Sequence, residues 1–187
     1  MAVQLEKGGK VNLNKEGSLS RVIIGLGWKS GLANNEEVDL DASAFLLTSS
    51  GKVRADGDFV FYNNKFSLDG AVEGADDNRE GGDGEGDNEE IQVNLENVAA
   101  PVTSIAFSAS IHSGQTFGTV RDAYIRVVNA DTQVEILRYD LTGDFSRNDA
   151  VVLGELQRSG GGWEFQATGE GLIGGLGAVA RKFGVNV

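Results

Sequence analysis

Short apolar runs separated by turn-forming residues recur along the whole chain. In 38–48 apolar and polar residues alternate at first, so that Asp39 and Asp41 project side by side from one face of an expected strand. Gly, Asn, Asp and Ser clusters bound most of the other runs, as turn signals do. Many short strands at this spacing predict an all-β fold, either an antiparallel sandwich or a barrel. The expected strands are 21–26, 38–48, 58–62, 91–95, 103–111, 123–128, 135–141, 150–158 and 163–167.

The two ends of the chain carry different signals. Residues 2–13 alternate around a pair of glycines and predict a β-hairpin. Residues 171–183 predict a short C-terminal helix, which three internal glycines weaken by about 1 kcal/mol each. Gly25-Leu-Gly27 lacks the third glycine of a dinucleotide-binding turn, so we interpret it as a loop that ends a strand. No linker or repeat divides residues 1–187, which predicts a single domain.

Composition narrows the range of functions. No stretch approaches the roughly 18 apolar residues of a membrane span, and the N-terminus lacks the order of a secretory signal. The chain has no cysteine, which fits a reducing compartment, and we expect a cytoplasmic location. The net charge of −12 argues against nucleic-acid binding, which needs clustered Lys and Arg.

Most of the negative charge belongs to one segment. Residues 69–90 contain ten acidic residues against Arg79 alone, a local charge of −9, while the rest of the chain carries only −3. The run from Asp76 to Glu90 is rich in glycine and has almost no apolar content, so it cannot contribute to a core. It must be either solvated or bound to a ligand.

Calcium is the ligand that this segment suits best. Ca²⁺ takes about 6 to 8 oxygens from carboxylates, amide side chains and backbone carbonyls, and the segment offers all three. The spacing from Asp76 through Asn78 and Glu80 to Asp87 mimics an EF-hand loop, but neither flank predicts a helix. The alternative is a disordered, solubilising loop, since charge runs are usually solvated. Further acids on strand edges favour calcium, because converging carboxylates repel unless a cation intervenes.

Several motifs follow one another along the chain: VDLDASAF at 38–45, DFVFYNN at 58–64, Asp77-Asn78 with the acidic run through Glu90, FGTVRDAY at 117–124 and RYDL at 138–141. Together they resemble the TerD family of tellurium-resistance and stress-response proteins. The resemblance covers essentially the whole chain. It implies a two-sheet β-sandwich with a short C-terminal helix and few small helical turns. It also implies a cytoplasmic, non-enzymatic protein that binds one or two Ca²⁺ ions and engages protein partners of the same stress-response system.

The resemblance and the acidic pattern together give an expected set of metal ligands. One departure is Asn88, where members of the family often carry a second aspartate, and an amide oxygen makes a weaker ligand than a carboxylate. We expect no catalytic residue. The expected calcium ligands are Asp39, Asp41, Asp69, Asp76, Asp77, Asn78, Asp83, Glu85, Asp87, Glu89 and Glu90.

Two alternatives from other functional classes stay open. Asp39 and Asp41 could serve a hydrolase as acid and base, although no cluster of aromatic sugar platforms accompanies them. His112 is the only histidine, and no Gly-x-Ser-x-Gly elbow accompanies it, which favours a structural role. The other alternative is a metal-independent interaction module that uses strand edges or residues 171–187. Trp28 and Trp163 are expected in the core.

Overall fold

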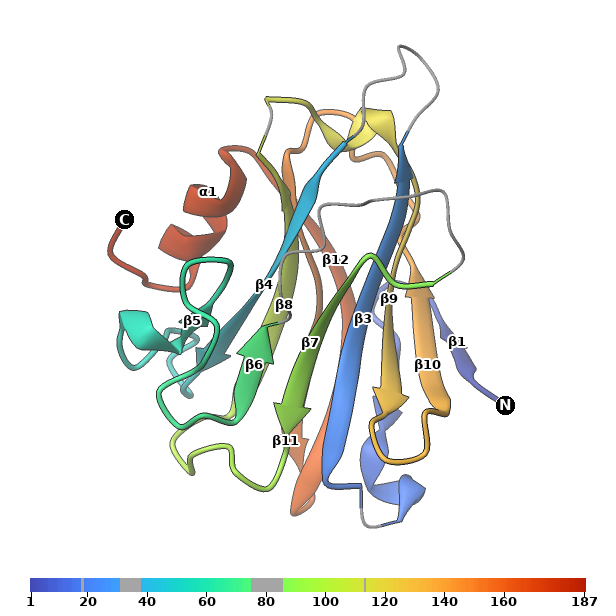
Figure 1. The fold of residues 1–187 in the computed structure, drawn as a ribbon, viewed down its shortest axis with the longest axis vertical. Helices are drawn as coiled ribbons and strands as arrows, with labels where there is room; N and C mark the ends of the chain where they lie inside the picture. Colours follow the sequence, from blue (N-terminus) through green and yellow to red (C-terminus); the bar gives the residue numbers. More distant parts are fainter. Residues whose placement is uncertain (18, 31–37, 75–85, 113) are drawn as a thin grey trace.

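The chain folds into two six-stranded sheets that pack face to face (Figure 1). This computed structural model describes residues 1–17, 19–30, 38–74, 86–112 and 114–187. The expected all-β sandwich is confirmed, and with it the short C-terminal helix and the few small helical turns. Those turns are 3-10 helices at Leu13–Glu16, Asp56–Asp58 and Phe117–Thr119.

The first sheet contains the strands that flank the acidic segment. Adjacent strands within this sheet run antiparallel except at one edge, where β1 lies parallel to β10. In spatial order the strands are β1 (Val3–Leu5), β10 (Glu135–Asp140), β9 (Val120–Asn129), β3 (Arg21–Ser30), β7 (Glu89–Asn94) and β6 (Val72–Gly74).

The second sheet is antiparallel throughout. Its strands in spatial order are β2 (Lys10–Asn12), β12 (Gly162–Leu172), β11 (Ala150–Ser159), β8 (Ser104–Ile111), β4 (Leu40–Leu47) and β5 (Phe59–Val60). The edge formed by β4 and β5 lies on the same side of the sandwich as β6 and β7 of the first sheet (Figure 1).

The second sheet is buried on both faces where the C-terminal helix covers it. Along β4, Leu40 and Leu46 pack into the core between the sheets, whereas Phe45 and Leu47 point to the opposite face. This period-two alternation is the geometry of a strand. On the opposite face, Phe45 packs with Phe183 beneath the helix α1 (Gly175–Lys182). Each large apolar side chain buried in this way contributes about 1.5–3 kcal/mol.

The helix α1 begins where the chain leaves β12. The backbone N–H groups of Gly174 and Gly175 donate to Oδ1 of Asp149 at 2.9 and 2.8 Å, so one carboxylate satisfies two donors at the helix N-terminus. Val179 and Ala180 are buried against the second sheet. The C-terminal segment is therefore part of the packed fold.

The predicted N-terminal hairpin is wrong. The strands β1 and β2 do not pair with each other, because β1 joins β10 of the first sheet and β2 joins β12 of the second. Between them Gly8 has a φ of +84° and its N–H donates to the carbonyl of Ala167. A glycine can take this backbone conformation without strain, and here it lets the chain cross from one sheet to the other.

The interpretation of Gly25-Leu-Gly27 as a loop is also wrong. β3 continues through both glycines to Ser30, and Gly25 pairs with Glu90 on one side and Arg126 on the other. The short strand β6 was not predicted, since three residues give too little alternation to recognise. Trp28 and Trp163 are 7% and 5% exposed, which confirms their expected place in the core.

Candidate functional site

The acidic residues 69–90 include β6, which forms one edge of the first sheet, and the start of β7, its neighbour. The described chain ends at Gly74 on one side of the segment and resumes at Gly86 on the other. Five of the expected calcium ligands lie outside the described residues: Asp76, Asp77, Asn78, Asp83 and Glu85. The other six are described.

Three expected ligands from both sheets line one pocket. Asp41 comes from β4, and Glu89 and Glu90 come from the first two positions of β7. Phe61 and Tyr62, which follow β5, line the same pocket. The two sheets thus bring together carboxylates that lie almost fifty residues apart in the chain.

A hydrogen bond holds the two sheets together beside this pocket. Oε2 of Glu89 accepts from the backbone N–H of Ala42 at 2.6 Å. One residue earlier, the N–H of Asn88 donates to the carbonyl of Leu26 at 2.8 Å, and Oδ1 of Asn88 accepts from the N–H of Trp28 at 2.8 Å. The amide at position 88 therefore extends the pairing between β7 and β3.

Asp87 points the other way, onto the outer face of the first sheet. Its carboxylate is 1% exposed and takes hydrogen bonds from Arg126. Nε donates to both oxygens at 2.8 and 3.0 Å, and Nη2 donates to Oδ2 at 2.8 Å. Tyr124 donates its hydroxyl proton to Oδ1 at 2.8 Å, and Glu135 accepts from the far side of Arg126 at 3.0 Å. We call Asp87, Tyr124 and Arg126 the clasp.

Two glycines make room for the clasp. A Cβ added at Gly25 would overlap the carboxylate of Asp87, and one added at Gly27 would overlap the ring of Tyr124. Burial and the hydrogen bond to Asp87 raise the pKa of Tyr124 above its ordinary value, so it stays protonated and remains a donor. The hydrogen bond to Asp87 likewise raises the pKa of the Arg126 guanidinium.

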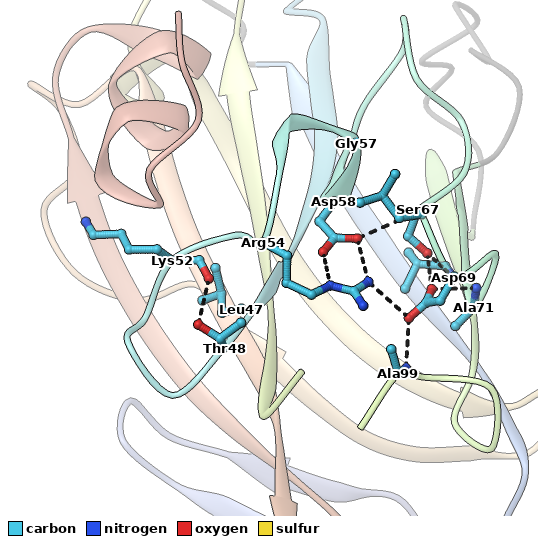
Figure 2. Close-up of polar contacts among 12 residues, drawn as sticks. Leu47, Thr48, Lys52, Arg54, Gly57, Asp58, Ser67, Asp69, Ala71 and Ala99 are labelled. Atoms are coloured by element: carbon cyan, nitrogen blue, oxygen red, sulfur yellow. Dashed lines mark hydrogen bonds and ion pairs between the residues drawn. The ribbon is translucent and has the colours of Figure 1, made fainter. Parts of the chain in front are cut away.

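Asp69 lies in a separate polar cluster just before β6, shown in Figure 2. Its Oδ1 accepts from the hydroxyl of Ser67 at 2.6 Å and from the N–H of Ala71 at 2.9 Å, and its Oδ2 accepts from the N–H of Ala99 at 2.9 Å. Burial opposes its ionisation, but these hydrogen bonds and Arg54 outweigh that effect and lower the pKa of Asp69 below its ordinary value.

The guanidinium of Arg54 joins Asp69 to a second buried acid (Figure 2). Nη2 lies 3.7 Å from Oδ2 of Asp69, while Nε and Nη2 donate to the two oxygens of Asp58 at 2.6 and 3.0 Å. The side chain of Asp58 is fully buried. This cluster ties the 56–58 turn, the approach to β6 and the loop at Ala99 to one another.

The six described ligand candidates therefore fall into different places. Asp41, Glu89 and Glu90 share the pocket, and Asp39 is exposed on the residue before β4 begins. Asp69 and Asp87 each lie in their own hydrogen-bonded cluster. Within the described ranges, no group of three or more His, Cys, Asp or Glu side chains is arranged to hold a metal ion by itself.

The pocket nevertheless fits calcium in its chemistry. Its charged groups are carboxylates, and hard cations such as Ca²⁺ prefer oxygen ligands. A complete shell would need further oxygens, and the expected ones belong to the part of the segment outside the described residues. Asp69 and Asp87 fit less well as ligands, because their oxygens already accept several hydrogen bonds.

Sequence reasoning assigned no role to Tyr124 and Arg126. The signal that could have found them is the glycine pair at 25 and 27, since a glycine inside a strand often marks a close approach by another group. The only histidine, His112, is exposed and directly follows β8.

Comparison with known proteins decides the family. Residues 1–183 match the TerD domain. The chain belongs to the TerD family. It is 48% identical over 191 residues to the tellurium resistance protein TerD of Serratia marcescens, covering 100% of this chain and 99% of that protein. It is also 42% identical over 193 residues to the general stress protein 16U of Bacillus subtilis, with full coverage of both chains.

Solved structures share the fold of this TerD-family chain. A homologue of telluride resistance protein (TerD) from Streptomyces coelicolor superposes with a TM-score of 0.64 at 20% identity. The match covers 89% of this chain and 97% of that one. No helix among the described residues is long and apolar enough to cross a membrane.

Proposed function

We propose that this chain is a calcium-binding, non-enzymatic protein of the tellurium-resistance and stress-response system. One observation carries the calcium assignment: Asp41, Glu89 and Glu90 line one pocket at the point where the acidic segment enters β7. The names of its relatives, a tellurium resistance protein and a general stress protein, support the cellular role. Family membership over the whole chain supports transferring that role here.

In this proposal the acids have two different tasks. Asp41, Glu89 and Glu90, with Asp39 nearby in the chain, supply oxygens from the sandwich edge. Further oxygens come from the segment between β6 and β7: Asp76, Asp77, Asn78, Asp83 and Glu85. Asp69 and Asp87 anchor the two ends of that segment through their hydrogen bonds. One or two Ca²⁺ ions would then offset a local charge of −9.

The ion would organise a surface for a partner. A protein of net charge −12 repels nucleic acid, so we propose protein partners of the same stress-response system in the cytoplasm. Binding only to the folded state would stabilise it by about 2.7 kcal/mol when free calcium is 100 times the dissociation constant.

Thermal unfolding with calcium and with chelator tests the proposal. We expect the melting temperature to rise with Ca²⁺ and to fall when the ion is removed. Asp41→Asn should reduce the calcium-dependent rise, since it removes one charged ligand. The control Asp144→Asn changes an exposed carboxylate that bonds to Ser146, and it should leave the rise intact. Equal melting temperatures in calcium and chelator would refute calcium binding.

A further inference from the structure

A second pocket lies on the first sheet beside the clasp. It has a volume of about 620 Å³ and is lined by Trp28, Lys29, Tyr124, Arg138 and Thr142 among others. This volume falls within the range of about 300–1,000 Å³ that small-molecule sites occupy. Its walls combine two aromatic rings with cationic and hydroxyl groups, which is the mixture that ligand sites use to combine burial with orientation.

The pocket presents a fixed cationic edge. The guanidinium carbon of Arg138 lies 3.7 Å from the centre of the Tyr124 ring, so the guanidinium stacks on the ring. Nε of Arg138 donates to Oδ1 of Asp140 at 2.8 Å, which sets its orientation. Arg138 makes no other hydrogen bond within the described part of the chain. Its Nη1 and Nη2 groups are therefore the donors that it can offer to a ligand.

Two carboxylates, Asp122 and Asp140, line the pocket together with Lys29 and Arg138, and each already has a partner. Both oxygens of Asp140 are engaged, one by Arg138 and one by Gln4 at 3.0 Å. Lys29 lies 3.5 Å from Asp122, but the two side chains are 55% and 68% exposed. Such a pair contributes about 0–1 kcal/mol, so a ligand can displace it at little cost. The donors that remain, the Nη groups of Arg138 and the weakly paired ammonium of Lys29, favour a ligand group that accepts hydrogen bonds, and an anionic group accepts them most strongly.

The backbone is distorted at the rim of this pocket. Asp122 has a φ of +52°, in the left-handed region that residues other than glycine rarely adopt. Opposite it, the register between β3 and β9 shifts between Gly27 and Lys29. Bulges of this kind re-aim side chains and are common beside binding sites. Here the distortion lies where Lys29 and Trp28 reach the pocket.

We propose that this pocket binds a small ligand through a carboxylate or phosphate group, which the Nη edge of Arg138 and the ammonium group of Lys29 would hold. Both anions present oxygens to which a guanidinium can donate two parallel hydrogen bonds. The aromatic rings would pack against the rest of the ligand. This site is separate from the calcium pocket, although Tyr124 connects the two regions through its hydrogen bond to Asp87.

Fluorescence of Trp28 tests this assignment. A Trp163→Phe background leaves Trp28 as the only tryptophan, and it lines the pocket. Inorganic phosphate and succinate are titrated separately, with sodium chloride at matched ionic strength as the reference. Arg138→Gln and Lys29→Gln are the test variants. Lys10→Gln is the matched control, because Lys10 is 48% exposed and pairs with Glu164 at 3.0 Å on the other sheet.

We expect a saturable change with at least one of the two anions, and the anion that produces it identifies the ligand class. Arg138→Gln and Lys29→Gln should each weaken apparent affinity by about tenfold or more, since hydrogen bonds to charged groups are strong. Lys10→Gln should bind as the parent does. Lys29→Gln gives an independent result if loss of Arg138 perturbs folding. No saturable response to either anion, the same response to chloride, or parental affinity in Lys29→Gln would overturn the proposal.

Discussion

Substitution of Gly25 by alanine should open the clasp without replacing any of its three residues. The added methyl group would occupy the position of the Asp87 carboxylate. Asp87 must then move away from Arg126 and Tyr124, or β3 must shift within the sheet. Either change breaks hydrogen bonds that an almost fully buried carboxylate now accepts.

The structure gives the size of the effect. Separating the partners of a buried ion pair costs about 3–5 kcal/mol. Arg126 is 28% exposed, so water can partly replace its lost partner, and we expect a loss of about 2–3 kcal/mol. For a chain of this length, each 1 kcal/mol shifts the melting temperature by about 2–4 °C. Gly25→Ala should therefore lower it by roughly 4–12 °C.

Urea unfolding and thermal melting followed by circular dichroism measure the loss. Gly74→Ala in β6 is the control, because its Cβ would meet Val60 at an ordinary 3.4 Å. It should change stability by less than about 1 kcal/mol. The double variant with Asp87→Ala isolates the cause. Once the carboxylate is gone, Gly25→Ala should cost almost nothing further. An undiminished cost in that background would refute the overlap with Asp87 as the reason.

Four other variants test separate parts of the fold. Gly169→Ala should destabilise the protein by about 2–3 kcal/mol, because φ is +59° and the Cβ would overlap the Tyr139 hydroxyl. Gly161→Ala, at φ +80° with nothing within 4 Å, should cost only about 1 kcal/mol in the same urea titration. Asp69→Asn should lower the urea midpoint at pH 7 and flatten its fall below about pH 4. The lowered pKa of Asp69 means that its stabilising contribution is present at neutral pH and is lost on acidification. Deletion of 175–187 should cause aggregation or dye binding to exposed apolar surface, because it uncovers the apolar side chains around Phe45 on the face of the second sheet that α1 covers.

The alternation of apolar and polar residues was sufficient to predict most strands, because each strand of a sandwich has one face toward the core and one face away from it. It worked best for β8 and β11, whose expected ranges 103–111 and 150–158 match the observed strands to within one residue, whereas β12 continues to Leu172, five residues beyond its expected end. It failed at residues 2–13, where local pattern predicts a hairpin but pairing with distant strands decides the outcome. The local sequence cannot reveal that β1 and β2 have better partners more than a hundred residues away.

The sequence predicted which segment is acidic, but it did not predict which acids line the pocket and which form separate hydrogen-bonded clusters. Counting acids identified the segment, and the two-residue period of residues 38–48 drew attention to Asp41, which lines the pocket. No local signal distinguishes Glu89, which faces the pocket, from Asp87, which faces Arg126. That difference depends on a partner 39 residues further along the chain and on a strand register that brings Gly25 beneath the carboxylate.

The two anchored acids give a physical reason why the segment between them could bind an ion well. Asp69 fixes the chain before β6 through Ala99 and Ser67, and Asp87 fixes it before β7 through Arg126. The entropic cost of bringing those ends together is therefore part of folding and not of ion binding. In the proposed calcium complex, the ion therefore does not have to bring those ends together, and pre-organisation of this kind strengthens binding. It follows that opening the clasp with Gly25→Ala should weaken calcium binding, although Gly25 contributes no ligand and the variant removes none.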